Sequence, residues 1–174
     1  MALVDVRFLG WLLQPTQQRA GAEQLPSASH ALQMLEGALR QAALDVDVVR
    51  VYWYADSPLT APVHDVLHRA VLDPDADGGV SLVRAMSGDL AALAAAGAVE
   101  HLLVVSDDER LLMSIDQAQL SGLSVHMLVD EAGVDIGRLS QDDPSWARLL
   151  AQADRCVVLA AGERGLTAGA PAQT

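Results

Sequence analysis

The chain has 174 residues, which suits one domain with a sizeable core, and 51% of its residues are hydrophobic although only 3% are aromatic. Its formal net charge of −12 argues against tight nonspecific binding to duplex DNA, which requires a basic surface. No apolar stretch is long enough for a transmembrane helix and the N-terminus lacks the features of a signal peptide, so we expect a cytoplasmic protein without a membrane-embedded part.

The first part of the chain predicts two strands and two helices. Residues 2–9 are predicted as a strand, and residues 10–26 as a loop with at most a short helix because they carry Gln, Gly and Pro. Leucine and alanine at helical spacing predict a helix over residues 30–44. Residues 47–54 are β-branched and aromatic and predict a strand, whereas residues 63–72 predict a short helix.

The middle of the chain continues the alternation of strands and helices. Residues 73–79 contain Pro and Gly and predict a loop. A leucine-rich face predicts a helix over residues 80–96, followed by a strand over residues 101–106. Residues 110–120 predict the next helix, and alternating apolar residues predict a strand over residues 124–129.

The last predicted elements complete a single domain over residues 1–161. Residues 144–153 predict a helix with proline near its first turn, and residues 156–160 predict a strand. The Gly- and Ala-rich residues 162–174 predict a flexible C-terminal tail. Alternating strands and helices predict an α/β fold, a three-layer α/β/α sandwich around a mostly parallel sheet of about five strands.

Composition also bears on the source of the chain and on its single cysteine. All 11 basic residues are arginine, and the absence of lysine and asparagine indicates the coding bias of a GC-rich bacterial genome. Cys156 cannot form an internal disulfide, so we expect a reducing compartment. Because Cys156 lies in an apolar run, we interpret it as a small buried hydrophobic residue rather than a nucleophile.

The most informative motif is an apolar strand that ends in acidic residues, Leu-Leu-Val-Val-Ser-Asp-Asp-Glu at positions 102–109. Asp5 and Asp56 also follow predicted strands. Right-handed crossovers place the carboxyl ends of parallel strands at one edge of the sheet, where open α/β sheets bind ligands. We therefore expect Asp5, Asp56, Asp107 and Asp108 to lie near that edge. The alternative is that these residues only cap the helices that follow them.

Carboxylates from separate strands can hold hard cations such as Mg²⁺ or Mn²⁺. Two such cations can clamp the attacking and leaving oxygens of a phosphodiester. Asp5 and Asp108 are the best placed for this role, and Asp89 on the preceding helix could project towards the same edge. Neighbouring residues of an extended segment point in opposite directions, so one of Asp107 and Asp108 should serve as a cap or a supporting group.

Several other sites find little support in the sequence. It contains no glycine-rich dinucleotide or phosphate loop. His64 and His68 have the spacing of a metal-binding helical pair, but no third ligand accompanies them, which favours a solvated or partner-facing helix surface. Ser106 lacks the glycines of a nucleophile elbow, so a serine hydrolase is not expected.

The chain resembles the NYN domain family, in the LabA-like branch of the PIN-like nucleases. The most distinctive similarity is Arg-Val-Tyr-Trp-Tyr at positions 50–54. The others, in the same order as in the family, are Val-Asp-Val-Arg-Phe-Leu at 4–9, Val-Val-Ser-Asp-Asp-Glu at 104–109, Gly-Leu-Ser-Val-His at 122–126 and Ala-Asp-Arg-Cys-Val at 153–157. Together they extend over residues 3–159.

This resemblance implies a Rossmann-like PIN fold and cleavage of RNA with acid-bound Mg²⁺ or Mn²⁺. The expected substrate is single-stranded RNA. By position it implies Asp5, Asp89 and Asp108 as catalytic acids. Of these acids, Asp5 and Asp108 are the expected metal ligands. Asp107, which has no counterpart in the family pattern, is predicted as a further metal ligand from its place beside Asp108.

The chain departs from the family pattern at three positions. The family's Lys-Gly-Val-Asp is replaced by Gly-Val-Ser-Leu-Val at positions 79–83, without the acid. Asp107 replaces the glycine of Val-Ser-Gly-Asp, and Arg110 replaces a further acid. Asp107 or Asp77 is a candidate to compensate.

Three hypotheses follow from these features. The leading one is a Mg²⁺- or Mn²⁺-dependent ribonuclease in which Asp5 and Asp108 hold metal and Asp89 orients metal or water. The second is a catalytically degenerate NYN-like interaction or regulatory module that associates with itself, favoured by the missing acid, the acidic surface and exposed aromatic candidates at Trp11 and Trp146. A receiver-like phosphoacceptor ranks third, because the chain contains no lysine.

Overall fold

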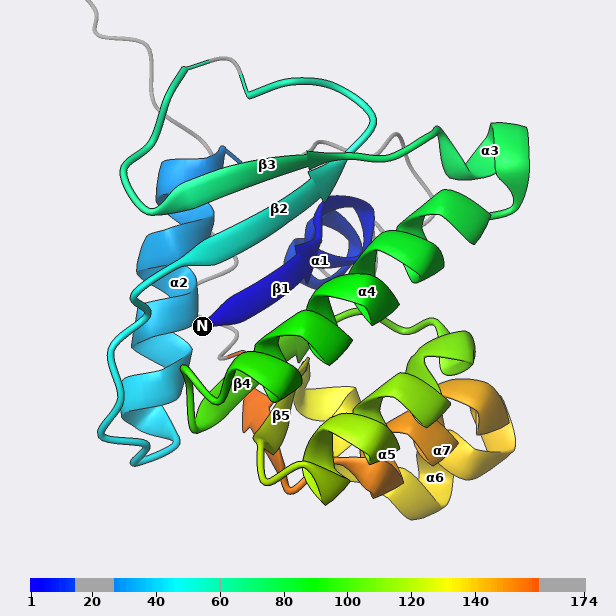
Figure 1. Ribbon diagram of the computed structural model, residues 1–174. Helices are drawn as coiled ribbons and strands as arrows, with labels where there is room; N and C mark the ends of the chain where they lie inside the picture. Colours follow the sequence, from blue (N-terminus) through cyan, green and yellow to red (C-terminus); the bar gives the residue numbers. More distant parts are fainter. Residues whose placement is uncertain (15–26, 60, 160–174) are drawn as a thin grey trace, which may run out of the picture.

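Six parallel strands form the centre of the molecule (Figure 1). The computed structural model describes residues 1–14, 27–59 and 61–159. The strands are β1 (Ala2–Asp5), β2 (Val51–Ala55), β3 (Val66–Ala70), β4 (His101–Val105), β5 (Ser124–Val129) and β6 (Arg155–Val158). They lie in the order β3-β2-β1-β4-β5-β6, and every neighbouring pair is parallel. The predicted α/β fold is confirmed, with six strands where about five were predicted.

Helices cover both faces of this sheet, as predicted for a three-layer sandwich. The helical segments are α1 (Val6–Leu13), α2 (Ala28–Gln41), α3 (Pro74–Asp77), α4 (Val80–Ala96), α5 (Leu112–Leu120), α6 (Ile136–Asp142) and α7 (Pro144–Gln152), with 3-10 turns η1 (Glu109–Leu111) and η2 (Glu131–Val134). Figure 1 shows α4 and α5 over one face of the sheet, whereas α1 and α2 lie on the other. This arrangement is the one that right-handed crossovers produce.

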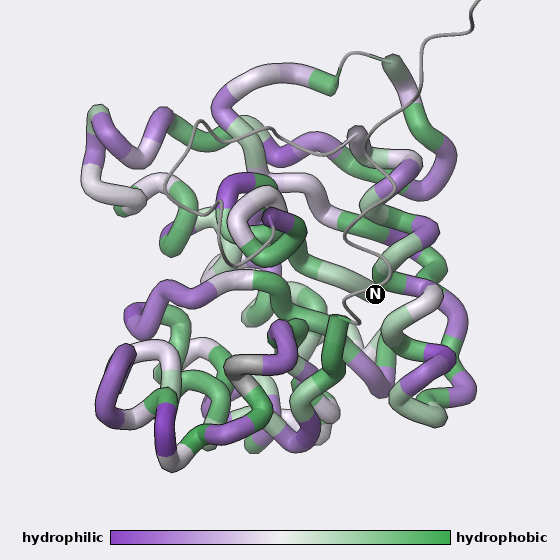
Figure 2. Tube along the Cα trace, turned by 180° about the vertical axis from the view of Figure 1, so that it is seen from behind, coloured by the Kyte–Doolittle hydropathy of each residue, from purple (hydrophilic) through white to green (hydrophobic). Residues whose placement is uncertain are grey.

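Aliphatic side chains of the central strands and of the covering helices form the core. Leu3 on β1, Leu102 on β4 and Leu90 on α4 have no exposed surface. Figure 2 shows green, hydrophobic stretches of the trace through the middle of the molecule and purple, hydrophilic residues at many of its outer turns. Strands buried on both faces read as continuous apolar runs, which is why β1 and β4 are recognisable in the sequence. Burial of each such leucine stabilises the fold by about 1.5–3 kcal/mol.

The predicted strand over residues 2–9 is wrong beyond Asp5. The strand β1 stops there, and the helix α1 begins at Val6. The carboxylate of Asp5 accepts hydrogen bonds from the backbone N–H groups of Arg7 and Phe8, which satisfies two donors of the first helical turn. The apolar residues that suggested a longer strand form the buried side of α1 instead.

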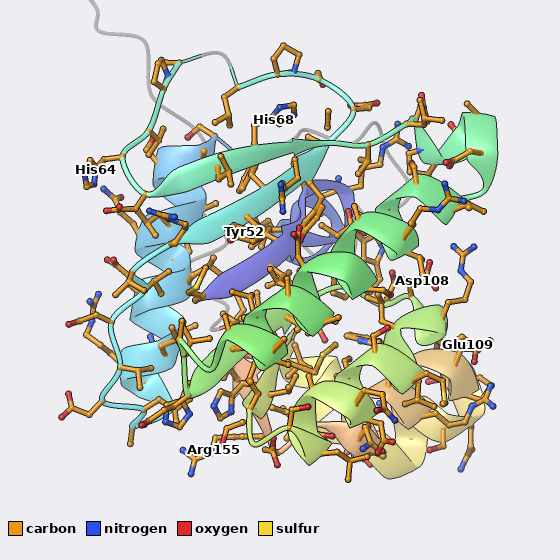
Figure 3. All side chains as sticks on the ribbon, viewed as in Figure 1. Tyr52, His64, His68, Asp108, Glu109 and Arg155 are labelled. Atoms are coloured by element: carbon orange, nitrogen blue, oxygen red, sulfur yellow. The ribbon has the colours of Figure 1, made fainter. Side chains whose placement is uncertain are left out.

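The predicted helix over residues 63–72 is also wrong, because this segment forms the edge strand β3. Its residues pair in parallel with β2, Val51 opposite Val66 and Ala55 opposite Ala70. Pairing with a distant strand therefore overrides the weak local helical pattern. His64 consequently lies in a turn and His68 on a strand, so they share no helical face, and Figure 3 shows them at separate places along this edge.

The remaining differences are smaller. Residues 74–77 of the predicted loop form the short helix α3, and α6 was not predicted at all. The predicted strand over residues 47–54 begins only at Val51, and the helix predicted over residues 110–120 begins as η1. Element ends carry weak local signals, which explains shifts of this size.

Some predictions concern residues outside the described part of the chain. They include residues 15–26 of the predicted loop and the tail predicted over residues 162–174. Within the described ranges, no helix is both long and apolar enough to cross a membrane.

Candidate functional site

The candidate site lies between β1 and β4, where the order of the strands reverses. From β1 the chain continues to β2 on one side, whereas β4 leads to β5 on the other. Such a switch point leaves a crevice at the carboxyl ends of the strands, which is the usual ligand site of open α/β sheets. A cavity of about 320 Å³ opens here. Its polar and aromatic lining consists of Asp5, Arg7, Phe8, Trp11, Asp107, Asp108 and Arg110.

Asp5 is the most buried acid of the cavity, with 8% of its surface exposed. Its Oδ1 accepts hydrogen bonds from the backbone nitrogens of Arg7 at 3.0 Å and Phe8 at 3.3 Å. Burial nevertheless raises the pKa of Asp5 to about 7, and the charges of Asp107 and Asp108 add to this shift. Asp5 is therefore both a helix cap and a carboxylate that a nearby cation would favour in its ionised form.

Asp107 lies beside it at the mouth of the cavity. Although its side chain reaches solvent, desolvation by the surrounding protein raises its pKa, and the nearby charges of Asp108 and Asp143 raise it further. Acids from β1 and from the end of β4 thus repel one another across a shared cavity, as expected from their positions after adjacent strands.

Asp108 is held differently, because Arg110 neutralises it. Nε of Arg110 lies 2.9 Å from Oδ1 of Asp108, and Nη2 lies 2.5 Å from Oδ2. The backbone N–H of Arg110 also donates to Oδ1, at 3.0 Å, which makes Asp108 the cap of η1. The carboxylate is only 17% exposed, and its hydrogen bonds with Arg110, followed by its charge, raise the pKa of Arg110. Figure 3 shows Asp108 and its neighbour Glu109 near the start of α5.

Asp89 is not brought to this cavity. It is buried on α4, and the described residues that line the cavity do not include it. Its two oxygens receive a bidentate ion pair from Arg69, whose Nε lies 2.9 Å from Oδ2. The hydroxyl of Tyr54 donates to Oδ2 at 2.7 Å, and burial, followed by this hydrogen bond, raises the pKa of Tyr54. These contacts connect α4 to β2 and β3.

Asp77, the other candidate to compensate for a missing acid, ends α3 and binds the backbone at the start of α4. Its Oδ1 accepts from the backbone nitrogen of Gly79 at 2.9 Å, and Oδ2 accepts from that of Ser81 at 2.8 Å. These bonds lower the pKa of Asp77, those from Ser81 most strongly. Of the two candidates, the structure places only Asp107 at the cavity.

The aromatic side chains form a cluster under one wall of the site. Trp146 packs edge-on against Phe8 and Trp11, with ring centroids 5.6 and 5.9 Å away. Only 3% of Trp146 is exposed, so the prediction of an exposed aromatic residue at this position is wrong. Trp11 is half-buried and lines the cavity together with Phe8, on which it stacks. The sequence alone did not distinguish a core tryptophan from a surface one.

Sequence reasoning overlooked two polar residues at this edge, Asp130 and Arg7. Asp130 directly follows β5 and is almost completely buried, so the rule that found Asp5 and Asp108 would have found it. Arg7 bridges to Asp56 at 3.4 Å and to Asp73 at 3.0 Å. No sequence signal pairs Arg7 with these residues, because they lie on distant segments.

The carboxylates of the cavity are ligands of the kind that a hard cation prefers, but their present arrangement does not suit one. Asp5, Asp107 and Asp108 supply carboxylate oxygens, which Mg²⁺ and Mn²⁺ prefer. Within the described part of the chain, however, no three His, Cys, Asp or Glu side chains are grouped so as to hold a metal ion. Arg110 occupies both oxygens of Asp108, so a cation would need this side chain to move.

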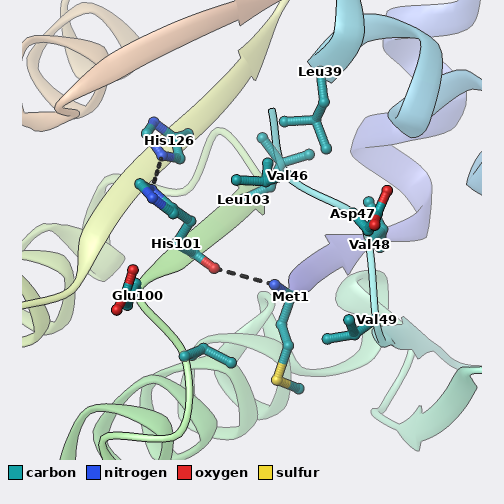
Figure 4. Close-up of a pocket in the computed structure, with 11 residues that line it drawn as sticks. Met1, Leu39, Val46, Asp47, Val48, Val49, Glu100, His101, Leu103 and His126 are labelled. Atoms are coloured by element: carbon teal, nitrogen blue, oxygen red, sulfur yellow. Dashed lines mark hydrogen bonds between the residues drawn. The ribbon is translucent and has the colours of Figure 1, made fainter. Parts of the chain in front are cut away.

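A second cavity, of about 330 Å³, lies at the opposite edge of the sheet (Figure 4). Its walls are mainly aliphatic, and His101 and His126 contribute a stacked pair with Nδ1 and Nε2 3.1 Å apart. Burial, followed by the proximity of His101, lowers the pKa of His126. Because this cavity lies at the amino ends of β1 and β4, it does not contain the predicted acids.

Comparisons with known proteins do not assign the chain to a family. No protein-family model, no curated protein and no solved structure matches it. The resemblance to NYN domains thus rests on the sequence motifs alone.

Proposed function

We propose that the cavity between β1 and β4 is the active site of a metal-dependent ribonuclease of the NYN or PIN-like type. The observation that carries this proposal is the convergence of Asp5, Asp107 and Asp108 on one cavity at the switch point of the sheet. Burial raises the pKa values of Asp5 and Asp107, and repulsion from the charge of Asp108 adds to both shifts. A divalent cation would relieve that repulsion, which is the electrostatic property expected of a cation site.

In this proposal Asp5, Asp108 and Asp107 would hold Mg²⁺ or Mn²⁺, which when bound acidifies water and polarises a phosphoryl oxygen. The two N–H donors on Oδ1 fix the orientation of Asp5, and Oδ2 receives no hydrogen bond from the described residues. Trp11, which is half-buried and stacks on the buried ring of Phe8, supplies an aromatic surface on which a base of single-stranded RNA can stack. Asp89 would act only indirectly, since Arg69 and Tyr54 occupy its oxygens.

A second function, a catalytically degenerate interaction or regulatory module, is favoured by a specific observation. Arg110 stands where the family carries a further acid and neutralises Asp108. If this ion pair is permanent, the cavity binds a partner without cleaving it. The two functions differ in whether Asp108 can bind a cation.

Cleavage of single-stranded RNA in the presence of Mn²⁺ tests the proposal. We expect the purified chain to cleave it, and Asp5→Asn or Asp108→Asn to reduce the rate roughly 100-fold or more, because each removes a charge that stabilises the reacting centre. Asp135→Asn is the matched control, because Asp135 is an exposed helix cap on α6. We expect this variant to cleave RNA at the same rate as the unmodified chain.

Equal cleavage by all four proteins would exclude this cavity as the active site. If none of them cleaves RNA and calorimetry detects no binding of Mn²⁺, the non-catalytic module is the better description.

A further inference from the structure

Arg110 is bound to the cavity from two sides. Its guanidinium forms a bidentate ion pair with Asp108, using Nε and Nη2. The same Nη2 donates to the carbonyl oxygen of Gly78 at 2.9 Å, on the turn between α3 and α4. Bidentate pairs between arginine and carboxylate are among the strongest charge-assisted hydrogen bonds. One side chain therefore connects the end of β4 to the turn before α4.

The turn before α4 is shaped to accept this guanidinium. Gly79 has a φ of +73°, and a Cβ added there would lie 2.9 Å from Nη2 of Arg110. The left-handed backbone conformation favours glycine at this position, and a side chain here would push the guanidinium of Arg110 away from the turn. On the other side of the cavity, Arg7 bridges to Asp73 at 3.0 Å, so two arginines hold the segment 73–79 against the cavity.

We infer that Arg110 is the resident cation of this cavity, and that a divalent cation binds Asp108 only by displacing it. The inference rests on the proposed function in that it assumes a cation site at Asp108. The two oxygens that a metal would use already accept hydrogen bonds from Arg110, so the two cations compete for the same carboxylate. Displacement also breaks the bond to Gly78, so cation binding partly releases the segment 73–79, which Arg7 still holds at Asp73.

Binding of Mn²⁺ to the intact chain, measured by isothermal titration calorimetry, tests this inference without relying on activity. Arg110→Gln removes the competing charge, and we expect it to bind Mn²⁺ at least about tenfold more tightly than the unmodified chain. Arg148→Gln is the matched control. Arg148 pairs with Glu109, with Nη2 2.6 Å from Oε2, and its replacement changes the net charge equally. Its affinity should stay within about twofold of the unmodified chain.

Two further measurements guard against a variant that misfolds. Arg110→Lys keeps the charge but lacks the bidentate fork, and we expect an affinity between those of the unmodified chain and Arg110→Gln. In the unmodified chain, Mn²⁺ should accelerate amide hydrogen exchange in the segment 73–79.

The outcomes separate this inference from the proposed function. If the unmodified chain binds Mn²⁺ and Arg110→Gln binds it equally or more weakly, the competition is excluded while the cation site stands. Unchanged exchange in the segment 73–79 on saturation with Mn²⁺ would exclude the release of that segment. If none of the proteins binds Mn²⁺, both the inference and the cation site are wrong.

Discussion

Replacing Asp89 with alanine should lower the free energy of unfolding by about 3 kcal/mol, because it leaves a buried ion-pair and hydrogen-bond network without its acceptor. Tyr54 is almost completely buried, and its hydroxyl would lose its partner on α4. Arg69 is partly exposed and can recover some hydration, which keeps the effect below that of a fully buried pair. Chemical denaturation monitored by tryptophan fluorescence measures the change.

The control for this prediction is an arginine–aspartate pair on the surface. Asp142 pairs with Arg138 on α6 at 3.7 Å and has a side chain that is 70% exposed. Asp142→Ala should change the free energy of unfolding by less than about 0.5 kcal/mol. The contrary result is that Asp89→Ala changes the free energy of unfolding as little as Asp142→Ala does and yet alters Mn²⁺ binding. In that case Asp89 orients metal or water, as the family resemblance implies, rather than stabilising the fold.

Asp5→Asn should stabilise the protein at about pH 8 by roughly 2–4 kcal/mol, while reducing any nuclease activity. Asn is as good a helix cap as Asp, so the start of α1 is preserved. The pKa of Asp5 is raised to about 7 in the folded state, so the folded chain retains a proton that the unfolded chain releases. The ionised carboxylate therefore destabilises the fold increasingly as the pH rises from about 4 to about 7, and by a constant amount above that range.

Thermal unfolding of both proteins as a function of pH measures this effect. The difference between Asp5→Asn and the unmodified chain should be close to zero near pH 4 and largest above about pH 7. Saturating Mn²⁺ should reduce the difference at high pH, because a cation bound at the cavity stabilises only the protein that retains the carboxylate. A difference that does not depend on pH would show that Asp5 acts on stability only through the cap.

Much of the fold was predictable because its signals are local. The buried strands β4 and β5 appear as continuous or alternating apolar runs, and α4 and α7 carry apolar residues at helical spacing. Asp107 and Asp108 could be placed at the ligand-binding edge because they directly follow β4, and Asp5 because it ends β1. A rule about strand ends needs no knowledge of distant contacts.

The remaining features depend on contacts between segments far apart in the chain. The strand β3 forms because β2 offers it a parallel partner, which no local pattern reveals. Asp89 has a suitable position in the sequence for a catalytic acid, but Arg69 on β3 binds it, and β3 was predicted to be a helix. The ion pair of Arg110 with Asp108 depends on a side-chain conformation that the turn at Gly78 supports.

The reversal of strand order between β1 and β4 has a consequence for how the molecule folds. The strands β1, β2 and β3 come from the first part of the chain, and β4, β5 and β6 come from the last part. The pairing of Leu3 with Val104 is the longest sequence separation in the sheet and the seam between these two parts. Closing a long loop carries the largest entropic penalty, so we expect this seam to form late in folding. Asp5 and Asp108 line one cavity across this seam, so the candidate site is complete only after the two halves of the sheet have joined.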